Sequence, residues 1–545
     1  MTRIPGGVPS AHLDTFARDR LPGQDLMPRF DYSMPHLADI PDRLNGASIL
    51  IDGAIGDGFA SKTAFFCGDA AWSYGEVQDK ADRIARVLVE DFGLVPGNRV
   101  LVRSANTPMA VACWLAVLKA GGVCVNTMAL LRARELVFIL NKAQISIALS
   151  DIDLAEELET AKGSGEALRH VSYFSSLCTG KGDLDRRLEK KTGGFKAVET
   201  AADDVALITF TSGTTGNPKG AMHLHRDILA VCRCWPQVFT IDQDEIITGS
   251  PSLAFTYGMA AFLMYPLYWR ATAALLPKPS ADAILETIDR RQVTSLYTVP
   301  TMYHALLEQA GTQSLKSLRK ASSAGEHLRQ RLWEGWLEKT GIRLVNGLGM
   351  TEFLTHFISE SMAVEKPGST GRAVPGYTVG VLDDEGNRLP LGSKGRLAAY
   401  GPTGGRYMDD GERQAKFVQN GWNVTGDIAE QDADGRFWYT DRSDDMIVTS
   451  GYNVSATEVE RVILDHPKVY ECAVVGIDDD ARGKIVRACI VLKDERDRSE
   501  STAKEIQDFV KATIAPYKYP RDIQFLEELP KTLTGKVQRY RLRTL

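Results

Sequence analysis

The stretch from residue 205 to residue 220 constrains this chain more than any other. The run Val205 to Phe210 is apolar and rich in β-branched residues, which predicts a buried strand. The loop after it has the sequence Thr-Ser-Gly-Thr-Thr-Gly-Asn-Pro-Lys-Gly, so glycines let the backbone turn and expose N–H groups, while hydroxyls and an ammonium add donors. Such a loop is suited to phosphates, and its candidate ligands are Thr211, Ser212, Gly213, Thr214, Thr215, Gly216 and Lys219.

Two other interpretations of this loop fit less well. A flexible polar linker is disfavoured because a buried strand leads directly into it. A P-loop of the G-x-x-x-x-G-K-S/T kind is disfavoured because Pro218 stands where the second glycine should precede the lysine, and Gly220 stands where a metal-binding hydroxyl belongs. The ten residues instead resemble the ATP-phosphate loop of the acyl-adenylate-forming superfamily, which includes acyl-CoA synthetases, peptide-synthetase adenylation domains and luciferases.

Length and composition limit the possible domain organisation and function of the chain. At 545 residues the chain is too long for one ordinary core, so two or more domains are expected. The net charge of -6 offers no basic field for nucleic acid, and the N-terminus lacks the apolar run of a signal peptide. Lys119 and Arg270 interrupt the longest apolar regions, so we expect no membrane span. Eight scattered cysteines form neither a disulfide lattice nor a zinc pattern, which predicts reduced thiols in a cytoplasmic protein.

Helical and strand patterns alternate from Trp72 onward. The expected elements are a helix from Tyr74 to Asp91, a strand from Arg99 to Val102, a helix from Met109 to Lys119 and a strand from Gly122 to Val125. Alternation of this kind predicts an α/β fold with parallel strands, whose ligands bind at the carboxyl ends of the strands. Residues 1 to about 60 are expected to wrap this body as an extended lead-in.

A second stretch with the same resemblance runs from Asn346 to Glu352, Asn-Gly-Leu-Gly-Met-Thr-Glu. Most relatives have Tyr at the position of Leu348, where it stacks on adenine, but aryl-CoA ligases similar to benzoate-CoA ligase have an aliphatic residue there. The resemblance implies that Thr351 hydrogen-bonds the α-phosphate. Glu352, together with Thr215, is expected to hold Mg²⁺, an ion that selects hard oxygen ligands. A helix N-cap is the alternative for the Thr-Glu pair.

Further nucleotide ligands lie toward the C-terminus. Asp427 follows a Gly turn and can accept from both ribose hydroxyls, with a plain Asx turn as the alternative. Arg442 would hold the ribose or a phosphate. The loop from Pro530 to Lys536 resembles the lysine loop of the superfamily, whose ammonium would stabilise the pentavalent α-phosphate; an exposed tail lysine is the alternative. The resemblance adds contacts to nucleotide or CoA from Gly325, Glu326, Asn346, Gly347, Leu348, Tyr439, Ser450, Gly451 and Arg482.

The resemblance also implies the domain organisation. A large N-terminal multi-subdomain α/β body with parallel sheets would cover residues 1–443, and a small mobile α+β domain residues 444–545, with Asp444 at the hinge. In one arrangement Lys536 would cap adenylate formation, and rotation would then bring Ser450 and Gly451 to a tunnel for pantetheine. Within the small domain the patterns predict a helix from Ala456 to Asp465, strands from Val469 to Val475 and from Ile485 to Leu492, and a helix from Thr502 to Ile514.

The segment before residue 259 is the candidate wall of an acid pocket. If it is extended, Phe255 and Tyr257 face one way, and Gly258 lets the chain turn into an apolar helix from Met259 to Leu267. Core packing is the alternative, but aryl-CoA ligases have an aromatic-Gly pair at this place. Residues 353–357 are expected to line the pocket as well. The candidates are Phe255, Tyr257, Gly258, Ala324, Gly349, Thr355 and His356.

These features predict an AMP-forming ligase of an aromatic acid and coenzyme A that uses ATP and Mg²⁺, with catalytic residues Lys219, Thr351, Glu352 and Lys536. We favour 2-aminobenzoate, then benzoate, as the acid. A medium-chain or other acyl-CoA ligase, or a stand-alone enzyme that loads a carrier protein, is the alternative. A binding protein without turnover is disfavoured because the charged residues of every motif are present. The sequence leaves the oligomeric state open, and a homodimer is one possibility.

Overall fold

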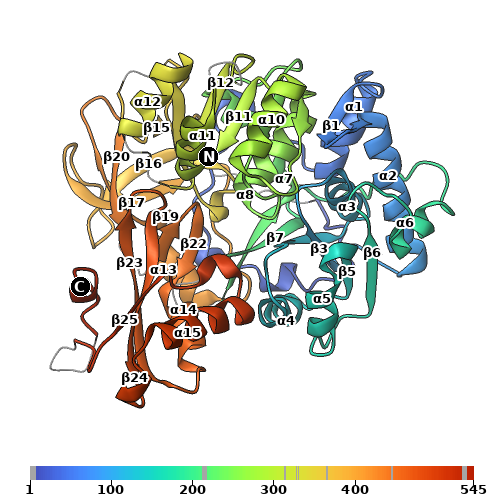
Figure 1. The fold of residues 1–545 in the computed structure, drawn as a ribbon. Coiled ribbons are helices and arrows are strands. Elements are labelled where there is room, and N and C mark those ends of the chain that lie inside the picture. Colours follow the sequence, from blue (N-terminus) through green and yellow to red (C-terminus); the bar gives the residue numbers. More distant parts are fainter. Residues whose placement is uncertain are drawn as a thin grey trace.

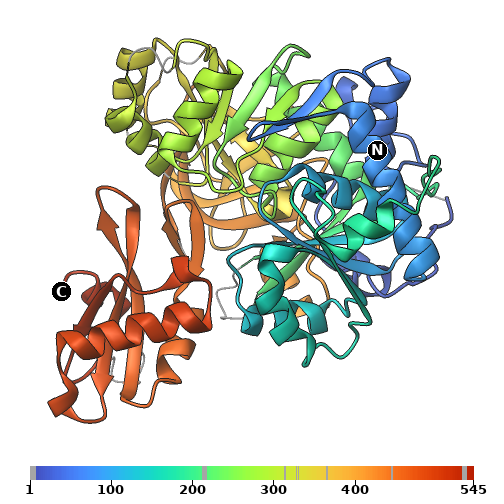
Figure 2. The ribbon, with the colours of Figure 1, turned by 45° about the vertical axis from the view of Figure 1, so that its right-hand side comes forward.

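Five β-sheets organise the part of the chain that the structure describes (Figure 1). The computed structural model describes residues 8–211, 218–311, 315–326, 328, 330–363, 366–442, 446–530 and 537–545, with the backbone alone at residues 441 and 442. Three sheets build a large body, and the other two belong to a smaller C-terminal part, coloured orange to red and set beside the body (Figure 2). The α/β body and the α+β C-terminal part confirm the predicted fold class.

The first sheet holds the strand that leads into the candidate phosphate loop. Its order is β6-β5-β3-β4-β7-β8, and all neighbours are parallel except β7 and β8. Because Thr211 pairs with Lys219, the loop joins two antiparallel strands at the carboxyl end of β7. The strands are β3 (Arg99–Ser104), β4 (Val123–Met128), β5 (Ile147–Asp151), β6 (His170–Phe174), β7 (Val205–Thr211) and β8 (Lys219–Leu224).

The second sheet has nine strands in the order β15-β14-β13-β12-β11-β9-β10-β1-β2. Its centre is parallel, and antiparallel strands close both edges. The strands are β1 (Thr63–Cys67), β2 (Ala70–Ser73), β9 (Ile246–Gly249), β10 (Thr272–Ala274), β11 (Ser295–Thr298), β12 (Lys320–Ser323), β13 (Leu344–Gly349), β14 (His356–Ser359) and β15 (Arg372–Ala373). The helices of the body are α1 (Gly53–Gly56), α2 (Tyr74–Arg86), α3 (Pro108–Lys119), α4 (Ala133–Lys142), α5 (Ala155–Lys162), α6 (Asp183–Leu188), α7 (His225–Cys234), α8 (Thr256–Met259), α9 (Tyr265–Trp269), α10 (Ala281–Arg291), α11 (Pro300–Gln309), α12 (Gln330–Thr340) and α13 (Gly411–Phe417).

The third sheet is antiparallel and consists of β16 (Thr378–Leu382), β17 (Lys394–Tyr400), β18 (Val418–Gln419), β19 (Trp422–Gln431) and β20 (Phe437–Arg442). The small domain contains the hairpin β21 (Met446–Thr449) and β22 (Tyr452–Ser455), the sheet β23 (Val469–Asp479), β24 (Gly483–Leu492) and β25 (Asp522–Phe525), and the helices α14 (Ala456–Leu464), α15 (Glu500–Thr513) and α16 (Arg539–Leu542). Its predicted helices and strands are confirmed. The predicted boundary at residue 443 adjoins residues outside the description and stays a prediction.

The N-terminal lead-in runs across the body, as expected. Backbone N–H groups of Leu13, Arg29 and Leu44 donate to carbonyls of Pro96, Gly421 and Thr200 over 2.8 to 2.9 Å. It also enters the core, because Leu50 and Ile51 in a π-helical turn are fully buried.

The segment around Gly258 differs from the prediction. Phe255 is extended, but α8 begins at Thr256, so Tyr257 and Gly258 are already helical and the expected alternation and turn are wrong. A Cβ at position 258 would lie 2.2 Å from the carbonyl oxygen of Ser252. Glycine is therefore required there by a close approach of the preceding loop.

Replacing Gly258 with alanine is expected to lower the midpoint of thermal unfolding. The added methyl must displace the Ser252 backbone, and overpacking of this kind costs about 1 to 3 kcal/mol. Gly163→Ala is the control, because a Cβ at that position meets nothing within 4 Å. An unchanged midpoint for Gly258→Ala would contradict the steric argument.

Candidate active site

A cavity of about 1110 Å³ lies where the large body meets the small domain. Most of the residues singled out in the sequence line it, although they come from distant segments. The predicted residues among its lining are Thr211, Lys219, Phe255, Tyr257, Ala324, Gly325, Glu326, Asn346, Gly347, Leu348, Gly349, Thr351, Glu352, Thr355, His356, Asp427, Tyr439 and Gly451. The structure therefore brings the separate motifs to one place.

Some predicted residues lie elsewhere. Gly258 does not line the cavity, since it faces the Ser252 loop. Ser450 and Arg482 are not among the residues that line the cavity; the Ser450 N–H donates to the carbonyl of Arg482 over 3.2 Å, and the Arg482 guanidinium lies 4.0 Å from Asp479. Ser212, Gly213, Thr214, Thr215, Gly216, Asp444 and Lys536 lie outside the described residues, as does the side chain of Arg442.

Residues 353–357 divide between cavity and core. Thr355 and His356 line the cavity, whereas Phe353, Leu354 and Phe357 are fully buried in the hydrophobic core. The expectation that the whole segment lines the pocket is therefore wrong. Leu354 has a φ of 64°, so the chain turns sharply between the 3₁₀ turn Thr351–Phe353 and β14.

The centre of the cavity is a buried charge cluster around Glu352. Its Oε1 lies 2.6 Å from Lys219 Nζ and accepts a hydrogen bond from the Tyr407 hydroxyl over 2.5 Å. Lys219 Nζ also donates to the Tyr407 hydroxyl over 2.9 Å. Burial alone would raise the pKa of Glu352, but the charge of Lys219 and the hydrogen bonds from Lys219 and Tyr407 outweigh it, so the pKa lies below its usual value. Glu352 is therefore ionised at neutral pH.

Tyr407 was missed by sequence reasoning. It lies outside every motif and is 188 residues from Lys219. Its ring packs edge-on against Phe417 with a centroid distance of 5.3 Å, and its N–H donates to Gln414 Oε1 over 2.9 Å. No local signal distinguishes this tyrosine, because its charged partners Lys219 and Glu352 are 188 and 55 residues away in the chain.

The backbones of the two ribose candidates are paired on neighbouring antiparallel strands. Asp427 on β19 is directly opposite Arg442 on β20, and Asp427 is buried at the cavity wall. The N–H of Asp427 donates to Thr425 Oγ1 over 3.2 Å. The carboxylate thus stands on a sheet, which holds it more rigidly than a loop would.

One end of the cavity is aromatic. His356 stacks on Trp235 with ring centroids 4.4 Å apart and an interplanar angle of 24°, and it meets Tyr257 edge-on at 5.2 Å. A Cβ at Gly347 would lie 2.6 Å from His356 Cδ2, so glycine lets the imidazole approach the backbone of β13. Burial lowers the pKa of His356 to about 3, and its Nδ1 has no hydrogen-bond partner. A neutral, incompletely hydrogen-bonded imidazole therefore borders the cavity.

The fit to Mg²⁺ rests on Glu352. No group of three or more His, Cys, Asp or Glu side chains within the described ranges could hold a metal ion. Mg²⁺ is commonly bound by one or two carboxylates together with waters and substrate phosphates, so a single buried, ionised glutamate at the cavity fits.

Comparison with known proteins supports these features. The protein-family model described as AMP-binding enzyme matches residues 55–406, and the one described as AMP-binding enzyme C-terminal domain matches residues 458–536. The chain belongs to the AMP-binding enzyme family. This confirms the resemblance to the acyl-adenylate-forming superfamily.

Relatives of this AMP-binding enzyme include several acid-CoA ligases. It is 31% identical over 516 residues to the benzoate-CoA ligase of Thauera aromatica, covering 94% of this chain and 98% of the relative. The mitochondrial acyl-coenzyme A synthetase ACSM3 of Rattus norvegicus is 32% identical over 498 residues, covering 87% of this chain and 84% of the relative. The crystal structure of the anthranilate CoA ligase AuaEII in complex with anthranoyl-AMP is 32% identical with a TM-score of 0.72, covering 94% of this chain and 98% of that chain.

The enzyme is accordingly an AMP-forming acid-CoA ligase, and its cofactors are ATP, Mg²⁺ and coenzyme A. In the described part of the chain, no helix has the length and apolar character needed to cross a membrane. The eight cysteines, all described, are free thiols.

Tyr407→Phe is expected to shift the acidic limb of the pH profile of ATP-pyrophosphate exchange to higher pH. The hydrogen bond from Tyr407 lowers the pKa of Glu352, so its loss raises that pKa, and the ionised form is lost sooner as the pH falls. Hydrogen bonds to charged groups contribute about 1.5 to 3 kcal/mol, so the shift should be measurable. Tyr470→Phe, at an exposed tyrosine, is the control, and coincident profiles for all three proteins would contradict the assignment.

Proposed function

We propose that the enzyme activates an aromatic carboxylic acid, with 2-aminobenzoate preferred over benzoate. The observation that carries this proposal is the aromatic end of the cavity, where His356 lies between Trp235 and Tyr257. Of these three rings His356 and Tyr257 line the cavity, and a flat ring can stack or pack edge-on against them. The similarity to benzoate and anthranilate CoA ligases supports the same substrate class.

Thr355 and His356 both line the cavity and are candidate acceptors for the ortho amine. The Thr355 hydroxyl already shares a hydrogen bond of 2.5 Å with the hydroxyl of buried Tyr265, which leaves it less acceptor capacity. His356 is neutral and lines the cavity, and because its Nδ1 is buried, the tautomer protonated at Nδ1 would leave Nε2 to accept from an aryl N–H. Since the pKa of His356 is about 3, this acceptor is present throughout the neutral pH range.

The reaction proceeds in two steps. A carboxylate oxygen of the acid attacks the α-phosphorus of ATP and pyrophosphate leaves; the thiolate of coenzyme A then attacks the acyl carbon and AMP leaves with the electron pair of the anhydride bond. Lys219 and Thr351 would bind phosphate oxygens, Asp427 would accept from the ribose hydroxyls, and Glu352 would bind Mg²⁺. When bound, Mg²⁺ would neutralise phosphate charge.

A second candidate function is that of a medium-chain or other acyl-CoA ligase. The similarity to the acyl-coenzyme A synthetase ACSM3 supports it, and loading of a separate carrier protein would use the same first step. Both alternatives keep adenylate formation and differ in the acid or the thiol. Cytoplasmic placement remains a prediction from the sequence.

A panel of aryl and alkyl acids in the ATP-pyrophosphate exchange assay tests the substrate class. We expect the highest kcat/KM for 2-aminobenzoate and formation of AMP. His356→Phe keeps an aromatic ring against Trp235 and should lower kcat/KM for 2-aminobenzoate about 3- to 10-fold, the contribution of one hydrogen bond, while benzoate serves as the internal control. Higher kcat/KM for benzoate in the wild type would overturn the preference, and formation of ADP would overturn the reaction.

Lys536→Ala is expected to block adenylate formation far more than CoA transfer from supplied acyl-AMP. The lysine would stabilise charge only at the α-phosphate in the first step. Asp444→Pro is the complementary variant, which should spare the first step and impair the second. Equal losses in both half-reactions for Lys536→Ala would remove that residue from its proposed role.

A further inference from the structure

Helix α4 of the large body carries a buried carboxylate that binds the small domain. Glu135 Oε1 lies 2.5 Å from Lys518 Nζ, and Glu135 Oε2 accepts a hydrogen bond from the N–H of Ala515 over 2.9 Å. Lys518 also lies 2.7 Å from Glu458 of α14. The side chains of Glu135 and Lys518 are only 5% and 4% exposed, so this ion pair is removed from water.

A second ion pair between the domains involves the residue next to Glu135 on α4, and this pair is exposed. Arg134 lies 2.9 Å from Asp465, with side chains 45% and 52% exposed. Exposed pairs contribute little, because water screens the charges and both long side chains lose freedom. Losing the Glu135 charge removes the contact of Lys518 to the large body and leaves Lys518 paired only with Glu458, and such a loss is costly in a poorly hydrated place. Glu135 is therefore the stronger interdomain contact of the two.

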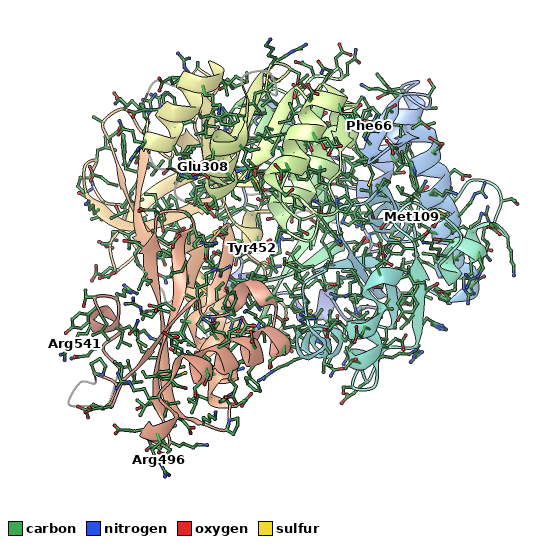
Figure 3. The ribbon with its side chains drawn as sticks, in the orientation of Figure 1. Phe66, Met109, Glu308, Tyr452, Arg496 and Arg541 are labelled. Carbon is green, nitrogen blue, oxygen red and sulfur yellow. The ribbon has the colours of Figure 1, made fainter. Side chains whose placement is uncertain are left out.

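The orientation that this ion pair stabilises puts the hairpin β21-β22 at the cavity. Gly451 lines the cavity, and its N–H donates to Glu326 of the large body. A Cβ at Gly451 would lie 2.8 Å from Val299 Cγ1, which indicates a tight contact between the domains. Figure 3 shows Tyr452 at the centre of the molecule and Arg541 on the opposite, outer edge of the small domain.

We propose that Glu135 is a positioning residue of the CoA-transfer step, because its ion pair with Lys518 holds the small domain with Gly451 at the cavity. This inference rests on the two-step function proposed above. Glu135 would act through the domain orientation, without contact to the reacting atoms. Since the adenylating arrangement requires the small domain to turn, the pair would have to separate before each first step and form again before each second step.

The test compares both half-reactions in Glu135→Gln, which keeps the size and an acceptor oxygen but removes the charge. We expect single-turnover CoA transfer from preformed acyl-AMP to fall at least about tenfold, because Lys518 then keeps only Glu458, a residue of its own domain, as a partner, while ATP-pyrophosphate exchange stays within about twofold or rises. Lys518→Met leaves both Glu135 and Glu458 without the ammonium and should give a split at least as large. Arg134→Gln, the neighbouring exposed pair, should leave both half-reactions within about twofold.

Hydrogen exchange gives a readout that does not depend on the substrate. The amide of Ala515 donates to Glu135, so in the unliganded enzyme it should exchange faster in Glu135→Gln than in the wild type or Arg134→Gln. Unchanged exchange at Ala515, or equal losses in the two half-reactions, would overturn the positioning role. If the wild type activates no acid, the proposed function fails, and the exchange of Ala515 still decides whether the pair holds the domains together.

Discussion

The ion pair between Lys219 and Glu352 is the contact on which the rest of the site depends. A carboxylate that is 2% exposed is stable only if it is paired and hydrogen-bonded, and Lys219 and Tyr407 satisfy the same oxygen. The three residues come from β8, from the 3₁₀ turn after β13 and from the segment before α13, so three separate parts of the large body converge on one charge. The ion pair and the hydrogen bond therefore connect three segments of the large body at the cavity.

The cavity is completed by a second body. The large domain supplies the proposed phosphate, ribose and acid walls, whereas Gly451 lies on a hairpin of the small domain. Buried Glu135 and Lys518 lie on the same side of this junction as the exposed pair Arg134 and Asp465. The junction also contains an aromatic contact, because Phe255 of the large body meets Tyr452 of the small domain edge-on with ring centroids 6.0 Å apart.

Sequence patterns located many of the elements and a substantial part of the cavity lining. The apolar run before Thr211 and the positions of Glu352 and Asp427 are local signals, and the structure places Thr211 at the end of β7, Glu352 in the 3₁₀ turn after β13 and Asp427 within the antiparallel strand β19. The same patterns misplaced Phe353 and Phe357, because a left-handed turn at Leu354 directs the two rings into the core. The helix at Gly258 begins earlier than predicted, since the Ser252 loop packs against it.

The sequence by itself determined the superfamily, the α/β character of the body and the kinds of side chain available to bind ATP, because each of these depends on residues close together in the chain. Only the tertiary structure decided that Tyr407 binds Glu352, that Trp235 supports His356 and that Glu135 binds Lys518. These pairs are separated by 55 to 383 residues, and no periodicity or motif links them. Their proximity results from how the sheets and domains pack. Packing buries charged groups such as Glu352 and Glu135, and a buried charge is stable only when a partner lies beside it.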